Sequence, residues 1–181
     1  MASGQKLGSA ADDFDAFESV IEKHRCRNIA TECVYNFTRL ETLGLRMDRH
    51  CEDAELLAAC LQKHNKVEWV NYATLDDNSY NAACKKITGG KASGILSFGI
   101  KGGRAGGTQF IDALQMILRL VNIGDAKSLA CHPATTTHRQ LNDEELASAG
   151  VSADLVRISV GIENIDDIIA DVSQALDQVS G

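Results

Sequence analysis

The sequence predicts an α+β fold in which a small sheet of about four strands is covered by helices. Four short apolar segments read as strands, segments with helical apolar periodicity lie between and around them, and no internal repeat is visible. With 181 residues, 44% of them hydrophobic, the chain can bury a core. We expect residues 37–181 to form this domain and residues 1–36 to form a flexible tail and a helical entry.

The last strand and helix carry the clearest pattern. In residues 155–162 an apolar set (Val156, Ile158, Val160, Ile162) alternates with a second set (Leu155, Arg157, Ser159, Gly161). The period then changes, and Ile165, Ile168, Ile169, Val172, Ala175 and Leu176 share one helical face, with Asp166, Asp167 and Asp171 opposite. Asn164 is a good N-cap for this helix.

The other elements follow in chain order. A long helix begins near Leu40 and runs for over twenty residues, with an apolar stripe made of Leu40, Leu43, Met47, Cys51, Ala54, Ala58 and Leu61. Strands are predicted at 67–72, 94–100 and 128–132, and short helices at 78–86 and from Asn142. A glycine-rich turn over 101–107 leads into a helix whose apolar positions are Phe110, Ile111, Leu114, Ile117 and Leu118.

Composition excludes some classes of function. A net charge of −7 argues against a nucleic-acid or anionic membrane surface, and no apolar run is long enough to span a bilayer. The first eleven residues do not resemble a secretory signal, so we expect a cytoplasmic protein whose six cysteines are reduced thiols. Cys131, His132 and His138 match no standard zinc spacing, and we predict no metal site.

Arg157 is the unusual residue of the last strand, because its position points it away from the apolar face. A guanidinium on a rigid strand can bind a carboxylate through two parallel hydrogen bonds, which lysine cannot do. From this strand alone, a solvated or salt-bridged arginine is the simpler interpretation.

Four ordered motifs make the chain recognisable between about Leu40 and Leu176. They are residues 40–50 (LETLGLRMDRH), 122–129 (NIGDAKSL), 132–138 (HPATTTH) and 157–163 (RISVGIE). Together they resemble the C-terminal part of the Cys/Met-metabolism family of pyridoxal-phosphate enzymes, and within it the O-acetylhomoserine sulfhydrylases. The resemblance implies the smaller, substrate-binding domain of a fold-type I transferase. Residues 12–36 match poorly.

This resemblance also implies roles for single residues. Arg157 would bind the α-carboxylate of an O-acetylhomoserine-like amino acid, Ser128 would lie near the same carboxylate, and Thr137 and His138 would line the site. For Ser128 a structural role at the strand end is the alternative. No residue of this chain is predicted to be catalytic or to bind the cofactor.

One departure from the family concerns its catalytic lysine. The family supplies a Schiff-base lysine in a Ser-x-Thr-Lys setting, and no lysine of this chain has that setting. We therefore expect pyridoxal phosphate in the complete enzyme but not on this chain alone. Two hypotheses follow: a substrate-binding domain of a transferase of sulfur amino-acid biosynthesis, or a non-catalytic remnant or interaction module. In either case the chain would pack against a full-length relative or form an oligomer with itself.

Overall fold

The computed structural model describes residues 39–180, and the compact unit begins at Leu45. Its centre is a five-stranded mixed sheet in the order β1-β2-β5-β4-β3. The strands are β1 (Val67–Asn71), β2 (Ile95–Ile100), β3 (Leu118–Arg119), β4 (Leu129–Cys131) and β5 (Leu155–Ser159). Neighbouring strands are antiparallel except for β3 and β4, which are parallel. The predicted α+β class is confirmed, with one strand more than expected.

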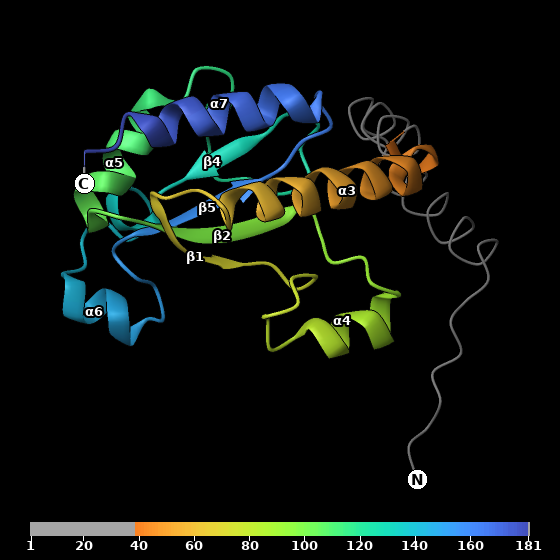
Figure 1. Ribbon diagram of the computed structural model, residues 1–181, viewed down its shortest axis with the longest axis horizontal. Coiled ribbons are helices and arrows are strands. Elements are labelled where there is room, and N and C mark those ends of the chain that lie inside the picture. The colour runs from red at the N-terminus through yellow and green to blue at the C-terminus, as the bar shows by residue number, and fades with distance from the viewer. Residues whose placement is uncertain (1–38, 181) are drawn as a thin grey trace, which may run out of the picture. The chain divides into compact units, whose positions relative to one another are not determined.

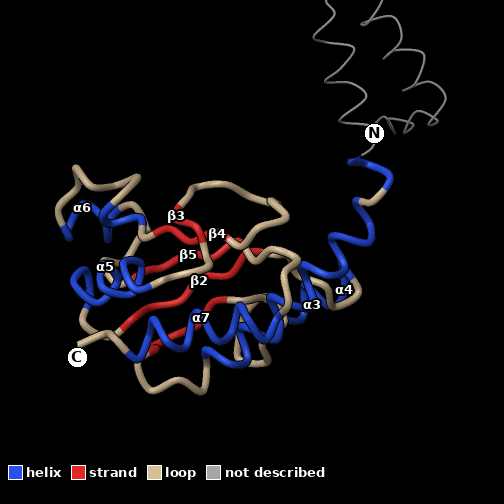
Figure 2. The backbone as a smooth tube through the Cα atoms, turned by 90° about the horizontal axis from the view of Figure 1, so that it is seen from above, coloured by secondary structure: helices blue, strands red, loops and turns tan. Residues whose placement is uncertain are grey.

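Helices cover one face of the sheet more fully than the other. Helices α3 (Leu43–Leu61), α5 (Gly103–Ala113) and α7 (Ile165–Asp177) pack on one face (Figures 1 and 2). On the opposite side, α4 (Asn81–Thr88) and α6 (Asp143–Ser148) lie apart from each other and leave the central strands open between them (Figure 1). A single 3₁₀ turn, η1 (Pro133–Thr135), follows β4.

The core lies between the sheet and α3, α5 and α7. Alternate side chains of β2 and β5, and that of Val160 directly after β5, point into it, as the period of a strand requires. They are Leu96, Phe98, Ile100, Val156, Ile158 and Val160. Phe98 meets Phe110 of α5 edge to face, with ring centroids 5.6 Å apart. The predicted inward face of the last strand is therefore confirmed up to Val160. Ile162, predicted on the same face, is exposed and lies three residues beyond the end of β5.

The segment from 101 to 119 differs from its prediction. Helix α5 begins at Gly103, inside the predicted glycine-rich turn, and a Cβ atom on Gly107 would overlap the imidazole ring of His132. The helix also ends at Ala113, before Ile117 and Leu118, which were predicted to be helical. Directly after this helix, the backbone N–H groups of residues 115–117 donate hydrogen bonds to the carboxylate of Asp171 in α7. The chain then continues into β3.

Two other predictions need correction. Asp171 was placed on the polar face of α7, but it is buried because its carboxylate satisfies those three N–H groups. The predicted stripe of α3 is buried only from Cys51 onward, and Met47 is exposed. The predicted tail and entry at 1–36 lie outside the described residues. Within 39–180, no helix has the length and apolar content needed to cross a membrane.

Candidate functional site

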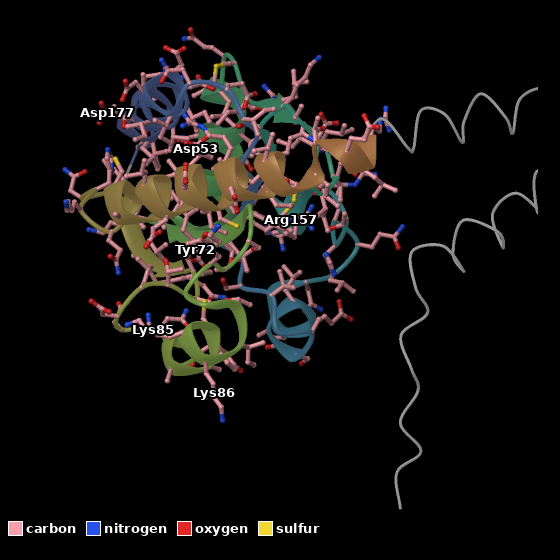
Figure 3. The ribbon with its side chains drawn as sticks, turned by 90° about the vertical axis from the view of Figure 1, so that its right-hand side faces the viewer. Asp53, Tyr72, Lys85, Lys86, Arg157 and Asp177 are labelled. Atoms are coloured by element: carbon pink, nitrogen blue, oxygen red, sulfur yellow. The ribbon has the colours of Figure 1, made fainter. Side chains whose placement is uncertain are left out.

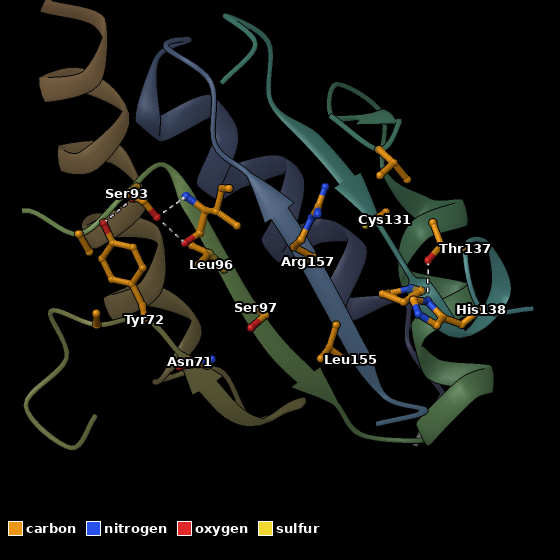
Figure 4. Close-up of a pocket in the computed structure, with 15 residues that line it drawn as sticks. Asn71, Tyr72, Ser93, Leu96, Ser97, Cys131, Thr137, His138, Leu155 and Arg157 are labelled. Atoms are coloured by element: carbon orange, nitrogen blue, oxygen red, sulfur yellow. Dashed lines mark hydrogen bonds between the residues drawn. The ribbon is translucent and has the colours of Figure 1, made fainter. Parts of the chain in front are cut away.

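Arg157 lies at the centre of the open face of the sheet. It is half-buried on β5, and its cross-strand neighbours are Ser97 of β2 and Cys131 of β4 (Figure 4). One guanidinium nitrogen donates a hydrogen bond to the backbone carbonyl of Asn122, with N and O 3.2 Å apart. Among the described residues Arg157 forms no ion pair. Its remaining N–H groups therefore have no carboxylate partner within this part of the chain.

A cavity of about 600 Å³ opens beside this guanidinium. Its lining comes from both flanking strands, from the loops after β1 and before β2, and from the loop after β4. The residues that bear polar side chains or lie next to Arg157 are Asn71, Tyr72, Ser93, Ser97, Cys131, Thr137, His138 and Leu155 (Figure 4). A volume of this size is typical of small-molecule sites.

The cavity contains one cation and no carboxylate among its lining residues. Burial raises the pKa of the Cys131 thiol, and the nearby Arg157 guanidinium offsets part of that rise. Burial also raises the pKa of Tyr72, whose hydroxyl donates to the backbone carbonyls of Ser93 and Cys51. Both groups stay neutral near pH 7. With one arginine and no carboxylate in its lining, the cavity is suited to recognise an anion.

Thr137 and His138, two of the residues predicted to line the site, lie at this cavity. The Thr137 hydroxyl and the Nδ1 atom of His138 are 2.8 Å apart and form a hydrogen bond (Figure 4). Their loop is anchored by His132, which is completely buried. The Nε2–H of His132 donates to the carbonyl of Ala153 at 2.9 Å, so Nδ1 accepts from the hydroxyl of Thr135.

This anchor predicts a pH-dependent loss of stability. Burial, together with the positive charge of Arg104, lowers the pKa of His132 below its ordinary value of 6.5. Below pH 6.5 the imidazole of His132 is therefore protonated in the unfolded chain but still neutral in the folded chain. The free energy of unfolding that neutral His132 contributes falls as the pH drops through that range. Urea unfolding at pH 7.5 and 5.5 should show a loss of up to about 1.4 kcal/mol per pH unit. The loss should be smaller in His132→Gln, and equal losses in the two proteins would contradict the assignment.

Ser128, the remaining predicted site residue, does not line the cavity. It is buried at the start of β4, where its hydroxyl donates to Glu163 at 2.9 Å and accepts from the N–H of Gly161 at 2.8 Å. Ser97 and Asn71 reach the cavity instead, although they were not predicted. Ser97 lies beside Arg157 because β2 pairs with β5. The sequence does not specify which strands are neighbours, so this contact could not be predicted from it.

The lysines of the described chain lie elsewhere. None of those between 39 and 180 lines the cavity, and Lys91, the one in the adjoining segment, pairs with Asp48 at 2.5 Å. Lys85 and Lys86 project from α4, apart from Arg157 (Figure 3). A Schiff base with pyridoxal phosphate needs a lysine at the reacting centre, so these residues do not fit as the cofactor's anchor. The described residues also contain no cluster of three His, Cys, Asp or Glu side chains able to hold a metal ion.

Comparison with known proteins assigns this architecture to a family. A family model of Cys/Met metabolism PLP-dependent enzymes matches residues 12–177. The chain belongs to this family. The crystal structure of a Campylobacter jejuni protein described as an O-acetylhomoserine (thiol)-lyase, which contains pyridoxyl-lysine phosphate, superimposes with a TM-score of 0.71. It is 44% identical, and the match covers 76% of this chain and 33% of that one.

Curated relatives agree with the family assignment. Homocysteine synthase of Schizosaccharomyces pombe is 51% identical over 138 residues, and O-acetyl-L-homoserine sulfhydrylase of Leptospira meyeri is 52% identical over 141 residues. L-methionine gamma-lyase of Pseudomonas putida is 46% identical over 138 residues. These matches cover 76%, 77% and 76% of this chain but only 32%, 32% and 34% of the relatives. The chain thus spans about one third of the length of its relatives.

Proposed function

We propose that this chain is the substrate-carboxylate-binding domain of a pyridoxal-phosphate-dependent O-acetylhomoserine sulfhydrylase. The complete enzyme would replace the acetoxy group of O-acetylhomoserine with a sulfur nucleophile in sulfur amino-acid biosynthesis in the cytoplasm. The observation that carries the proposal is Arg157, a half-buried guanidinium without an ion-pair partner among residues 39–180, at the wall of a cavity of about 600 Å³.

The geometry of the site supports this role for Arg157. Arg157 lies on the rigid strand β5, and one of its guanidinium nitrogens donates a hydrogen bond to the carbonyl of Asn122. The N–H groups that bond neither to Asn122 nor to the Cys131 thiol can donate to both oxygens of a carboxylate, which orients an amino acid as well as binding it. Thr137 and Ser97 add hydroxyl groups at the same cavity. Ser128 would support this site indirectly, through the loop that precedes β4.

The cofactor and its lysine belong to a different part of the proposed enzyme. No lysine among residues 39–180 lines the cavity, and no lysine of the sequence has the Ser-x-Thr-Lys setting, so the groups that hold pyridoxal phosphate would come from another polypeptide segment. That segment would be carried by a full-length relative or by another copy in an oligomer. This chain's own contribution is to bind and orient the substrate.

A ligand titration of the purified chain tests the proposal directly. Chemical shifts of the Arg157 and Ser97 amides should move on addition of O-acetyl-L-homoserine. The methyl ester of the same amino acid, which has no carboxylate, should bind at least about tenfold more weakly, because charge-assisted hydrogen bonds are worth roughly 1.5–3 kcal/mol.

The ester is also the control for binding to the rest of the amino acid. Equal affinity for acid and ester would contradict carboxylate recognition, and so would shifts confined to residues away from the cavity. Absence of any shift at millimolar ligand would favour the alternative, a non-catalytic interaction module.

A further inference from the structure

The segment of residues 122–128 connects the wall of the cavity to the half-buried carboxylate of Glu163. It joins the end of β3 to β4 and passes along β5 and the residues that follow it. Four backbone hydrogen-bonding groups of this segment meet that stretch: the carbonyl of Asn122, the N–H of Gly124, the carbonyl of Ala126 and the N–H of Ser128. Their partners are, in the same order, Arg157, Ser159, the N–H of Ile162 and Glu163.

Glu163 fixes the far end of this segment. One carboxylate oxygen accepts the backbone N–H of Ser128 at 2.7 Å, and the other accepts the Ser128 hydroxyl at 2.9 Å. The same hydroxyl accepts the N–H of Gly161 at 2.8 Å. Bonds that a carboxylate accepts are stronger than neutral ones, and Ser128 is only 1% exposed, so little water competes.

The absence of a side chain at residue 161 makes this arrangement possible. A Cβ atom on Gly161 would overlap the Glu163 carboxylate and the backbone at Ala126 and Lys127. The backbone at residues 126–127, Gly161 and Glu163 are thus packed against one another without room for a methyl group. Such packing transmits a displacement at Glu163 to the segment instead of absorbing it.

The near end of the segment carries the contact that orients Arg157. The carbonyl of Asn122 accepts a hydrogen bond from the Arg157 guanidinium at 3.2 Å, which restricts the rotamers of this side chain in the open cavity. We propose that Glu163 is a positioning residue for carboxylate recognition. By fixing residues 122–128, it places the Asn122 carbonyl that aims Arg157 at the substrate. This inference rests on the proposed function of Arg157.

Three variants separate positioning from general stability. Glu163→Ala removes both acceptors, whereas Glu163→Gln keeps an amide oxygen for the Ser128 N–H and an amide that can donate to its hydroxyl. Glu145→Ala is the matched control, because Glu145 also accepts a backbone N–H, from Asn142 at 2.9 Å, but does so in the capping box of α6 and lines no part of the cavity.

Two measurements should be made on each variant of the 181-residue chain. The first is the dissociation constant for O-acetyl-L-homoserine, and the second is the Nε–H resonance of Arg157 without ligand. In Glu163→Ala we expect binding to weaken by about fivefold and the resonance to shift, as couplings through packed networks of this kind allow. Glu163→Gln should restore both to near the wild-type values, and Glu145→Ala should change neither.

The outcomes distinguish this inference from the proposed function. If the wild-type chain does not bind the amino acid, the proposed function fails, and the ligand-free resonance of Arg157 still tests the link to Glu163. If the wild type binds and folded Glu163→Ala matches it in both measurements, the positioning role alone is wrong. If Glu163→Ala does not fold, Ser128→Ala takes its place, since it removes only the hydroxyl link. It should then weaken binding and shift the resonance in the same direction, and wild-type values would overturn the inference.

Discussion

The Arg157→Lys variant should bind O-acetyl-L-homoserine at least about tenfold more weakly than the wild-type chain while keeping its stability. Lysine preserves the positive charge but offers a single ammonium group, so it loses the paired, planar donors that match the two oxygens of a carboxylate. Losing one charge-assisted hydrogen bond costs roughly 1.5–3 kcal/mol, and about 1.4 kcal/mol corresponds to a factor of ten. Isothermal titration against the amino acid measures the effect.

The stability should stay unchanged because Arg157 makes few contacts within the described chain. Its guanidinium bonds to the carbonyl of Asn122 and to the thiol of Cys131, and it forms no ion pair with residues 39–180. Arg119→Lys is the matched control, since Arg119 lies on the edge strand β3 of the same sheet, outside this cavity, and pairs with Asp112 at 2.6 Å. Wild-type affinity in Arg157→Lys, or an equal loss in Arg119→Lys, would show that the guanidinium does not recognise the ligand.

The sequence predicted the elements whose patterns are local. Alternation in residues 155–160 placed Val156, Ile158 and Val160 in the core and Arg157 on the opposite face, and the structure agrees. The helical periodicity of α7 and its N-cap at Asn164 were also found, because both depend on side chains within one or two turns. These features need no knowledge of what the element packs against.

The errors concern features decided by distant contacts. The early end of α5 depends on Asp171, more than fifty residues later in the chain. The burial of Asp171 depends in turn on the three backbone N–H groups that donate hydrogen bonds to its carboxylate. Ser128 has a polar side chain at a strand end, which fits a ligand site as well as it fits a structural hydrogen bond to Glu163, 35 residues away. The position of Ser97 beside Arg157 likewise follows from strand order, which local periodicity does not contain.

Asp171→Asn should lower the free energy of unfolding by about 2–4 kcal/mol without changing the affinity of the Arg157 cavity. The Asp171 carboxylate accepts three backbone N–H groups, from Gln115, Met116 and Ile117, at 2.9, 3.0 and 2.9 Å. An asparagine has one acceptor oxygen, and its amide N–H₂ would face backbone donors, so at least one buried N–H loses its partner. An unsatisfied buried donor costs roughly 1–3 kcal/mol, and the lost charge on the remaining bonds adds to this.

Urea denaturation of this variant should be compared with that of Asp167→Asn. Asp167 lies on the same helix but is exposed in its first turn, where a carboxylate contributes only about 0.3–1 kcal/mol through the helix dipole. A loss in Asp171→Asn no larger than that in Asp167→Asn would mean that the carboxylate does not hold the end of α5. A large loss with unchanged ligand affinity would place the contact where the structure puts it, on the helical side of the sheet and away from Arg157. This result would also explain why the chain leaves the helix at residue 114 and forms β3, although the apolar pattern of residues 110–118 favours a longer helix.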